Sequence, residues 1–300
     1  MSSFTIMVDT NADMPQEFFE ENGIETIAIP FHIDGKQHSG GRWQEISDIE
    51  FYNALRDGSA AGTALANPEA FSSVFAEYAS QNKPLLLITL SSGLSGTYQN
   101  SVIALEDIKE QYPNCEIYSV DSLNAAGGAG LVTKLAVNKR EEGLSAGETA
   151  AWLEEKRQSC ISLFTVDDLM YLHRGGRLSK LSAVAGSIIG IKPLLNVAPD
   201  GTLKLKDKAR GRKGSLSTLC KQMMRSLNDN AKLDTVVISH SNCLEDAQSL
   251  AAMVRSAIDV REVIVTMMGP VIGAHVGPGC VALFYEADMT REVYESKFYS

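Results

Sequence analysis

Residues 85–100 read LLLITLSSGLSGTYQN, where an apolar run of strand character passes directly into serines and glycines and then into a helical pattern. The same order recurs in FTIMVDTNADMPQEFF at residues 4–19 and in EIYSVDSLNAAGGAGLVTKLAV at residues 116–137. Short strands that alternate with helices indicate βαβ units, which build a mainly parallel sheet with helices on both faces. The sequence therefore predicts an α/β protein whose N-terminal part is a doubly wound sheet.

The polar loops that follow these three strands mark the expected ligand site, because ligands of such sheets bind beyond the carboxyl ends of the strands. The loops are Asp9–Asn11, Ser91–Thr97 and Asp121–Ser122. We expect them to share one edge of the sheet. A fourth strand is predicted within GIETIAIPFHIDGKQ, residues 23–37, and it leads into a turn at Asp34 and Gly35.

The length of 300 residues exceeds what one hydrophobic core usually serves and favours two domains. A helical pattern at residues 146–159 is followed by a new series of strands and helices. We place the boundary there, which gives an α/β domain of residues 1–159 and an α/β domain of residues 160–300. Further elements expected in the second domain are strands at residues 235–240 and 262–268 and a helix at residues 244–258. A cleft or tunnel between the domains is the natural place for a ligand.

The composition narrows the possible functions. Hydrophobic residues make up 44% and charged residues 21%, and no segment reaches the roughly 18 apolar residues that cross a bilayer, so we expect no stable membrane insertion. The formal net charge of −10 would repel phosphate backbones and disfavours nucleic-acid binding. The start MSSFTIMVDTNADM lacks the basic region of a secretory signal, which predicts a cytoplasmic protein.

The five cysteines are scattered, odd in number and without a C-x-x-C pair, which argues against a disulfide framework and a zinc site. They are Cys115, Cys160, Cys220, Cys243 and Cys280. The sequence also shows no nucleotide-binding glycine motif and no metal-binding constellation. We therefore expect reduced, buried thiols, no metal and no cofactor.

The segment SSGLSG at residues 91–96 admits three interpretations. Serines and glycines at a helix start offer free N–H groups, hydroxyls and the positive end of the helix dipole, which together bind a carboxylate or a phosphate. Alternatively, Ser92 and Ser95 only cap the helix. The third interpretation is the nucleophile elbow of a serine hydrolase or acyltransferase, although residues 93–97 lack the second glycine of G-x-S-x-G.

His275 lies in GPVIGAHVGPG, residues 269–279, which we interpret as a constrained loop because four glycines and two prolines surround the histidine. A histidine held in this way can donate to an anion or transfer a proton, and the simpler interpretation is a buried neutral ring bonded to backbone. In a hydrolase it would pair with one of the serines above. Asp9 or Asp121 would then orient the histidine.

Two basic clusters could meet a phosphate or an acidic partner surface, although solvated charge is the simpler interpretation. The first is Arg174, Arg177 and Lys180 in LHRGGRLSK, and the second includes Arg210, Arg212 and Lys213 in KDKARGRKG.

Six segments taken together carry a resemblance to a known family. They are VDTNADMP, SSGLSGTYQ, VDSLNAAGGAG, GGRLSK, IKPLLNV followed by DGTL and RGRK, and GPVIGAHVGPG. Over essentially its whole length the chain resembles the DegV family of bacterial fatty-acid-binding proteins, which are acyl-carrying subunits of a fatty acid kinase. The resemblance implies two α/β domains that enclose an acyl tunnel.

The resemblance also implies a ligand and a partner. The ligand would be a long-chain fatty acid, and the partner would be the catalytic subunit of a fatty acid kinase, which phosphorylates the presented carboxylate to an acyl phosphate. This chain would then be a lipid-binding protein and not itself an enzyme. A lipid transport or storage protein differs only in having no kinase partner.

Site residues follow from the resemblance by position. The fatty-acid carboxylate would be held at Ser92, completed by Ser95, the Gly96 amide, Thr63 and His275, while Arg177 would serve kinase docking or phosphate charge. Two segments depart from the family pattern. The family's T-S-Q-P reads TALA at residues 63–66, and HSGGRWQEIS at residues 38–47 replaces an acidic turn, so we assign that segment no role.

Overall fold

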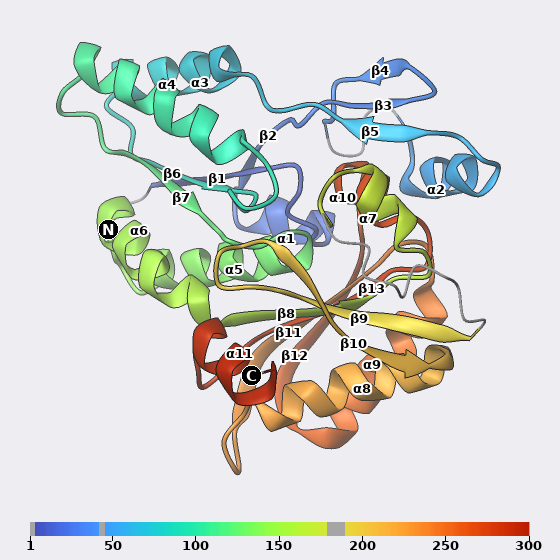
Figure 1. Cartoon of the computed structure of the whole chain (residues 1–300). Coiled ribbons are helices and arrows are strands. Elements are labelled where there is room, and N and C mark those ends of the chain that lie inside the picture. The colour runs from blue at the N-terminus through green and yellow to red at the C-terminus, as the bar shows by residue number, and fades with distance from the viewer. Residues whose placement is uncertain (1–3, 42–45, 179–189, 300) are drawn as a thin grey trace.

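The computed structural model describes residues 4–41, 46–178 and 190–299. Its main elements stack in five layers, in which a parallel sheet and a mixed sheet alternate with three layers of helices (Figure 1). A small third sheet and a short helix lie beside this stack, at the upper right of Figure 1. The α/β class expected from the sequence is confirmed.

The first sheet has the order β2-β1-β6-β7, and all of its strands are parallel. Its strands are β1 (Thr5–Asp9), β2 (Glu25–Ile27), β6 (Leu85–Thr89) and β7 (Ile117–Asp121). Every residue of β6 is buried, which explains its unbroken apolar sequence LLLIT, because helices cover both faces of the sheet. The parallel N-terminal sheet is therefore confirmed.

The carboxyl ends of β1, β6 and β7 meet at one edge, as expected. The Leu90 N–H donates to Oδ2 of Asp9 over 2.7 Å. The Ser92 N–H donates to Oδ1 of Asp121 over 3.1 Å. These two carboxylates therefore tie the three polar loops together through the backbone.

Several helices of the first half accompany the parallel sheet, and two of them begin at a side-chain cap. They are α1 (Gln16–Glu21), α3 (Pro68–Ser80), α4 (Thr97–Gln111), α5 (Gly127–Glu141) and α6 (Ala146–Lys156), with the 3₁₀ turn η1 (Arg157–Ser159) after α6. Before α3, the Asn67 side chain accepts the Glu69 N–H, and Pro68 takes the first helical position. Ser145 and Glu148 form a capping box at the start of α6.

The second sheet has the order β10-β9-β8-β13-β11-β12, and only β11 and β12 run parallel. Its strands are β8 (Cys160–Thr165), β9 (Ile191–Val197), β10 (Leu203–Arg210), β11 (Lys232–His240), β12 (Asp259–Met267) and β13 (Val281–Glu286). Helices α8 (Gly211–Arg225), α9 (Leu244–Ala257) and α11 (Arg291–Tyr299) lie on its outer side (Figure 1). The two strands and the helix predicted for this half correspond to β11, β12 and α9.

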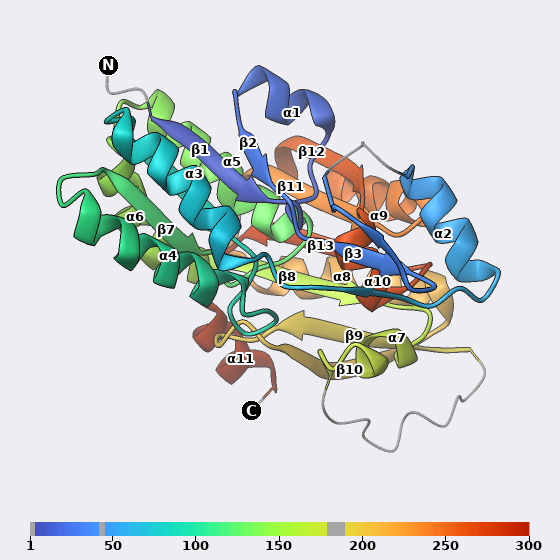
Figure 2. The same ribbon diagram turned by 90° about the horizontal axis from the view of Figure 1, so that it is seen from above.

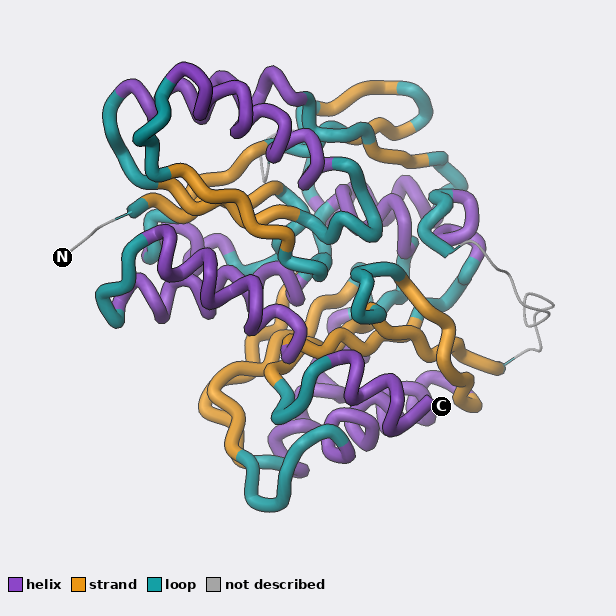
Figure 3. The backbone as a smooth tube through the Cα atoms, turned by 60° about the vertical axis from the view of Figure 1, so that its left-hand side comes forward, coloured by secondary structure: helices purple, strands orange, loops and turns teal. Residues whose placement is uncertain are grey.

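Helix α5 lies between the two sheets and packs against strands of both. Figure 3 shows this helical layer between the two groups of strands. One buried cluster therefore includes Val8 from β1, Ala129 from α5 and Phe284 from β13. The second sheet starts at Cys160, but the core is continuous across this point, and the division of the chain at residue 159 stays a prediction.

The segment expected to form a fourth strand forms three short strands instead. After β2 the chain leaves the parallel sheet, and the Ile29 N–H donates to the Thr10 hydroxyl, while Pro30 has no N–H to donate to a neighbouring strand. Strands β3 (Phe31–Ile33) and β4 (Lys36–His38) then form a hairpin whose turn at Asp34 and Gly35 was predicted. The third strand of this sheet is β5 (Ala61–Thr63), and the helix α2 (Asp48–Arg56) lies beside the sheet (Figure 2).

The segment around His275 is a helix, and our interpretation of it as a loop was wrong. Helix α10 (Pro270–Val276) begins with Pro270 at its first position and ends at Gly277, whose φ is 67°. Proline at a first helical position and glycine after the last one delimit a short helix. The neighbouring helix α7 (Met170–Arg174) packs against α10.

Lys180 and residues 42–45 of the segment without an assigned role lie outside the described residues.

Candidate functional site

A cavity lies between the carboxyl edge of the parallel sheet, helix α10 and the inner face of the mixed sheet. Most of its lining is apolar and includes Leu90, Phe164, Val197, Val271, Ile272 and Phe284. Its volume is about 70 Å³, several times what one water molecule requires. Among the described residues, the charged or hydrogen-bonding polar side chains in the lining are those of Thr63, Ser95, Arg177 and His275.

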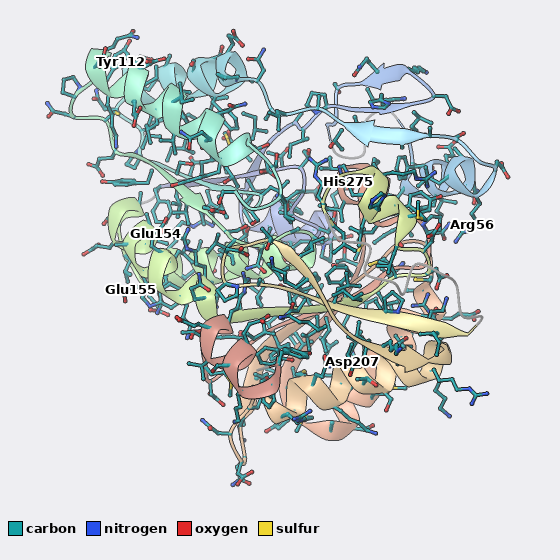
Figure 4. All side chains as sticks on the ribbon, viewed as in Figure 1. Arg56, Tyr112, Glu154, Glu155, Asp207 and His275 are labelled. Atoms are coloured by element: carbon teal, nitrogen blue, oxygen red, sulfur yellow. The ribbon has the colours of Figure 1, made fainter. Side chains whose placement is uncertain are left out.

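These four side chains lie together at one part of the wall. Nε2 of His275 is 2.8 Å from the hydroxyl of Thr63, the last residue of β5. The Arg177 side chain donates through Nε to the carbonyl of Leu94, next to Ser95, over 3.1 Å, and through Nη1 to the carbonyl of Gly175 over 2.6 Å. Figure 4 shows His275, which belongs to α10, beside α7. The cavity thus has an extended apolar wall and one polar end.

Burial makes His275 a neutral ring and leaves Arg177 as the cation of this polar end. Burial, together with the charge of Arg177, lowers the pKa of His275 to about 4. Burial also lowers the pKa of Arg177, which remains charged at neutral pH because the ordinary value is so high. We find no carboxylate among the described residues within ion-pair distance of Arg177.

The Thr63 hydroxyl can donate to Nε2 of His275 or accept from it, so the surroundings of the other ring nitrogen decide the tautomer. Its Nδ1 is buried and has no hydrogen-bond partner in the described chain. The nearby guanidinium favours a lone pair over an N–H at this atom, so we assign the proton to Nε2, which donates to the Thr63 oxygen. The Thr63 hydroxyl hydrogen is then available to an acceptor in the cavity.

The structure brings Ser95 to the cavity but not Ser92 or Gly96. Ser91 fixes this turn, because its hydroxyl donates to the Gly201 carbonyl and accepts the Gly93 N–H. The Ser92 side chain is exposed, whereas Ser95 lines the cavity. Gly96 is the N-terminal cap residue of α4 and does not line the cavity either. Of the hydroxyls in this motif, that of Ser95 is therefore the one at the cavity. It also accepts the Thr97 N–H over 3.3 Å at the start of α4 and lies 2.9 Å from the Thr97 hydroxyl.

The two acidic residues considered for a hydrolase, Asp9 and Asp121, accept backbone hydrogen bonds that fix the loops. Asp9 accepts the N–H groups of Leu90 and Asn11, and Asp121 accepts those of Ser92 and Leu123. Neither carboxylate lines the cavity. His275 contacts the Thr63 hydroxyl on one nitrogen and has no described carboxylate on the other. A serine–histidine–acid arrangement is absent from the described residues.

The basic clusters are dispersed. Arg177 lines the cavity, Arg174 stacks over the Tyr171 ring at 4.8 Å, and Arg212 pairs with Asp167 and Asp246. Arg210 and Lys213 are exposed.

The cysteines are free thiols, of which Cys160, Cys220 and Cys280 are buried and the other two are half-buried. Across residues 4–41, 46–178 and 190–299, no group of side chains is arranged to hold a metal ion. In the same ranges, no helix combines the length and the apolar character needed to cross a bilayer.

Several residues of the site were not identified from the sequence. The apolar wall combines Phe164 and Phe284 from the mixed sheet with Ile272 from α10, and hydrophobic strand patterns alone do not distinguish a cavity wall from a filled core. Gly175 contacts the His275 ring, and the one feature of the sequence that could have drawn attention to it is the Gly-Gly pair at residues 175 and 176.

Comparisons with known proteins give one consistent result. The model of the DegV family matches residues 3–288. A DegV domain-containing protein of Clostridium perfringens is 38% identical to this chain, and the match covers 97% of this chain and 100% of that protein.

Solved structures show the same fold. A DegV lipid-binding protein of Thermotoga maritima has a TM-score of 0.85 and 28% identity, and the match covers 97% of this chain and 100% of that chain. A DegV family protein of Thermus thermophilus, described by its fatty acid binding, has a TM-score of 0.84 and 27% identity, with 95% and 99% coverage.

Proposed function

The chain belongs to the DegV family, and from this premise we propose that it binds a long-chain fatty acid in the cavity described above. The observation that carries the proposal is the combination of an apolar wall with one polar end made by Thr63, Ser95, Arg177 and His275. The relatives from Thermotoga maritima and Thermus thermophilus, described as binding lipid and fatty acid, support the same class of ligand.

The apolar wall would supply most of the affinity. Burial of a methylene contributes about 0.8 kcal/mol, so a chain of about fourteen methylenes would contribute on the order of 11 kcal/mol before the costs of ordering. The acyl chain would lie against an apolar surface that includes Phe164, Phe284 and Ile272.

The polar end would fix the orientation of the ligand. A carboxylate removed from water is costly unless charges and hydrogen-bond donors compensate it. Arg177 offers a half-buried positive charge, and the hydroxyls of Thr63 and Ser95 offer donors. His275 would act indirectly, since its Nε2–H occupies the Thr63 oxygen and thereby directs the hydroxyl hydrogen to the carboxylate.

The second part of the proposal concerns the fate of the bound acid. The family resemblance implies that a partner kinase phosphorylates the carboxylate to an acyl phosphate, with nucleotide and metal chemistry supplied by the partner. The positive charge of Arg177, at the polar end, would then stabilise the additional negative charge of the phosphate. This chain would act as the carrier and not as the catalyst, in the cytoplasm. Lipid transport or storage without a kinase is the alternative, and it requires the same site.

Native mass spectrometry of the purified protein, followed by extraction of its ligand, tests the first part. We expect one fatty acid per chain. A protein that carries no fatty acid and takes up none when it is added would refute the proposal. Addition of ATP and a fatty acid kinase to the loaded protein then tests the second part, which predicts an acyl phosphate and is contradicted by an unchanged acid.

Two serine variants locate the carboxylate. Ser95→Ala should weaken fatty-acid binding about tenfold, because a hydrogen bond to a charged group is lost. Ser92→Ala is the matched control, since this exposed side chain lies outside the cavity, and it should bind like the wild type. The reverse ranking in a titration with a fluorescent fatty acid would return the carboxylate to Ser92, where the motif match placed it.

A further inference from the structure

Gly175 lies against the ring of His275. A Cβ atom at position 175 would lie less than 3.0 Å from Nδ1 of His275, a distance that real Cβ atoms essentially never show. The backbone of Gly175 has φ −71° and ψ −9°, which any residue can adopt. The structure therefore needs glycine at this position for its missing side chain and not for its conformational freedom.

Helix α10 packs tightly against α2, which opposes its displacement by a larger residue at position 175. Gly273 lies so close to Tyr52 and Phe51 of α2 that an added Cβ would be less than 3.0 Å from both. The Tyr52 hydroxyl also donates to the Met268 carbonyl just before α10 over 2.8 Å. A side chain at position 175 would therefore displace the imidazole ring and not the helix that carries it.

Displacement of the ring would disturb the Thr63 hydroxyl of the polar end, while the backbone of Gly175 separately holds Arg177. Nε2 of His275 is 2.8 Å from the Thr63 hydroxyl, so a shift of the ring breaks or lengthens this bond. The carbonyl of Gly175 itself accepts Nη1 of Arg177 over 2.6 Å. One residue without a side chain thus sets the place of both the ring and the guanidinium.

We propose that Gly175 is a positioning residue of the head-group site, whose missing side chain lets the His275 ring approach and hold the Thr63 hydroxyl as a donor toward the ligand carboxylate. This inference rests on the proposed function for the identity of the ligand. The contact between residue 175 and the ring does not depend on the proposed function, because the structure shows it directly.

The test compares Gly175→Ala with Gly214→Ala, a control in helix α8 where the nearest atom to an added Cβ is at 4.0 Å. In a titration with a fluorescent fatty acid, Gly175→Ala should weaken binding about tenfold or more, since the carboxylate loses an oriented donor. Gly214→Ala should keep the wild-type affinity. In the ligand-free protein, ¹⁵N NMR of His275 should show that Gly175→Ala alone disturbs the hydrogen-bonded Nε2 signal.

A double variant separates positioning from a general effect on the fold. In a His275→Ala background there is no ring to displace, so adding Gly175→Ala should change affinity by less than about twofold. If Gly175→Ala alone fails to fold, the double variant should recover folding. The inference is overturned if the Gly175→Ala effect is equally large without the ring, if the double variant also fails to fold, or if the His275 NMR signals are unchanged by Gly175→Ala. A wild type that binds no fatty acid refutes the proposed function alone, because the NMR comparison needs no ligand.

Discussion

His275 is the residue at which burial, charge and hydrogen bonding act together. Its side chain is half-buried with Nδ1 fully enclosed, its Nε2 bonds to Thr63, and the cation of Arg177 lies nearby. An uncharged histidine suits a site whose charge should come from one fixed guanidinium, because a second cation would repel the first. The consequence is a folded state that resists protonation of this ring.

Stability should therefore depend on pH through His275. Its pKa is about 4 in the folded protein and near the ordinary value of 6.5 in the unfolded chain, so between these values the unfolded chain binds the extra proton. The stabilisation is fully present above about pH 6.5 and is lost as pH falls towards 4, by about 2 kcal/mol at pH 5.

Urea unfolding of the wild type and of His275→Asn at about pH 7.5 and about pH 5 measures this effect. The wild type should lose about 2 kcal/mol more than the variant on acidification. His240, whose pKa burial also lowers, is present in both proteins and cancels in the comparison. Equal losses in the two proteins would mean that the ring is not held neutral by the fold.

The serine motif shows where residue-level prediction ends. The sequence predicted a loop of serines and glycines before a helix at residues 91–97, and the structure has this loop, in which the hydroxyls of Ser91 and Ser95 both form hydrogen bonds within the protein. Which hydroxyl faces the cavity depends on the Ser91 bonds to Gly201, a residue far away in the chain. Short-range patterns carry no information on such a contact, and Ser95 could not be preferred to Ser92 from sequence.

At the scale of elements, Ala126, the residue just before helix α5, has a strained backbone conformation and also lines the cavity. Ala126 has φ 54° and ψ −137°, a conformation that favours glycine, and its carbonyl accepts the Asp13 N–H. The chain adopts it because the connection from β7 must turn sharply before the helix starts at Gly127. Ala126 also lines the cavity, so the strain lies at the site.

Ala126→Gly should stabilise the protein by about 1 kcal/mol, since relief of backbone strain exceeds the entropy that glycine adds to the unfolded chain. Ala129→Gly, three residues later in the first turn of α5, should destabilise it by about 1 kcal/mol or more, because a buried methyl group is lost and glycine is a poorer helix former. Thermal unfolding of both variants checks this contrast. If Ala126→Gly destabilised the protein as much as Ala129→Gly does, the backbone of Ala126 would not be strained.

Long periodic elements were predictable and short ones were not. The strands β6 and β7 and the 15-residue helices α4 and α5 after them have enough residues to show a pattern. Helix α10 has only seven residues, and its glycines indicated a loop because their role lies in contacts with Tyr52 and Tyr171, which come from other elements. The three-residue strands of the small sheet are likewise too short to show alternation.

At the scale of the whole molecule, the two halves of the chain share one core. Helix α5 joins Val8 of the first sheet to Phe284 of the second in a single buried cluster. The buried side chain of Arg291 donates to the carbonyls of Leu123 and Cys160, which belong to the two halves. Separation of the halves would expose this cluster and leave those carbonyls without their donor.

The chain should therefore unfold in one cooperative transition, although the sequence predicted two domains divided at residue 159. Both tryptophans, Trp43 and Trp152, lie in the first half, so their fluorescence follows that half, while far-UV circular dichroism follows the whole chain. The two signals should give the same midpoint and slope in urea, because neither half keeps its buried surface without the other. Arg291→Met should lower both midpoints equally. A fluorescence transition that separates from the dichroism transition, in either protein, would mean that residues 1–159 fold independently and that the shared core contributes little to their stability.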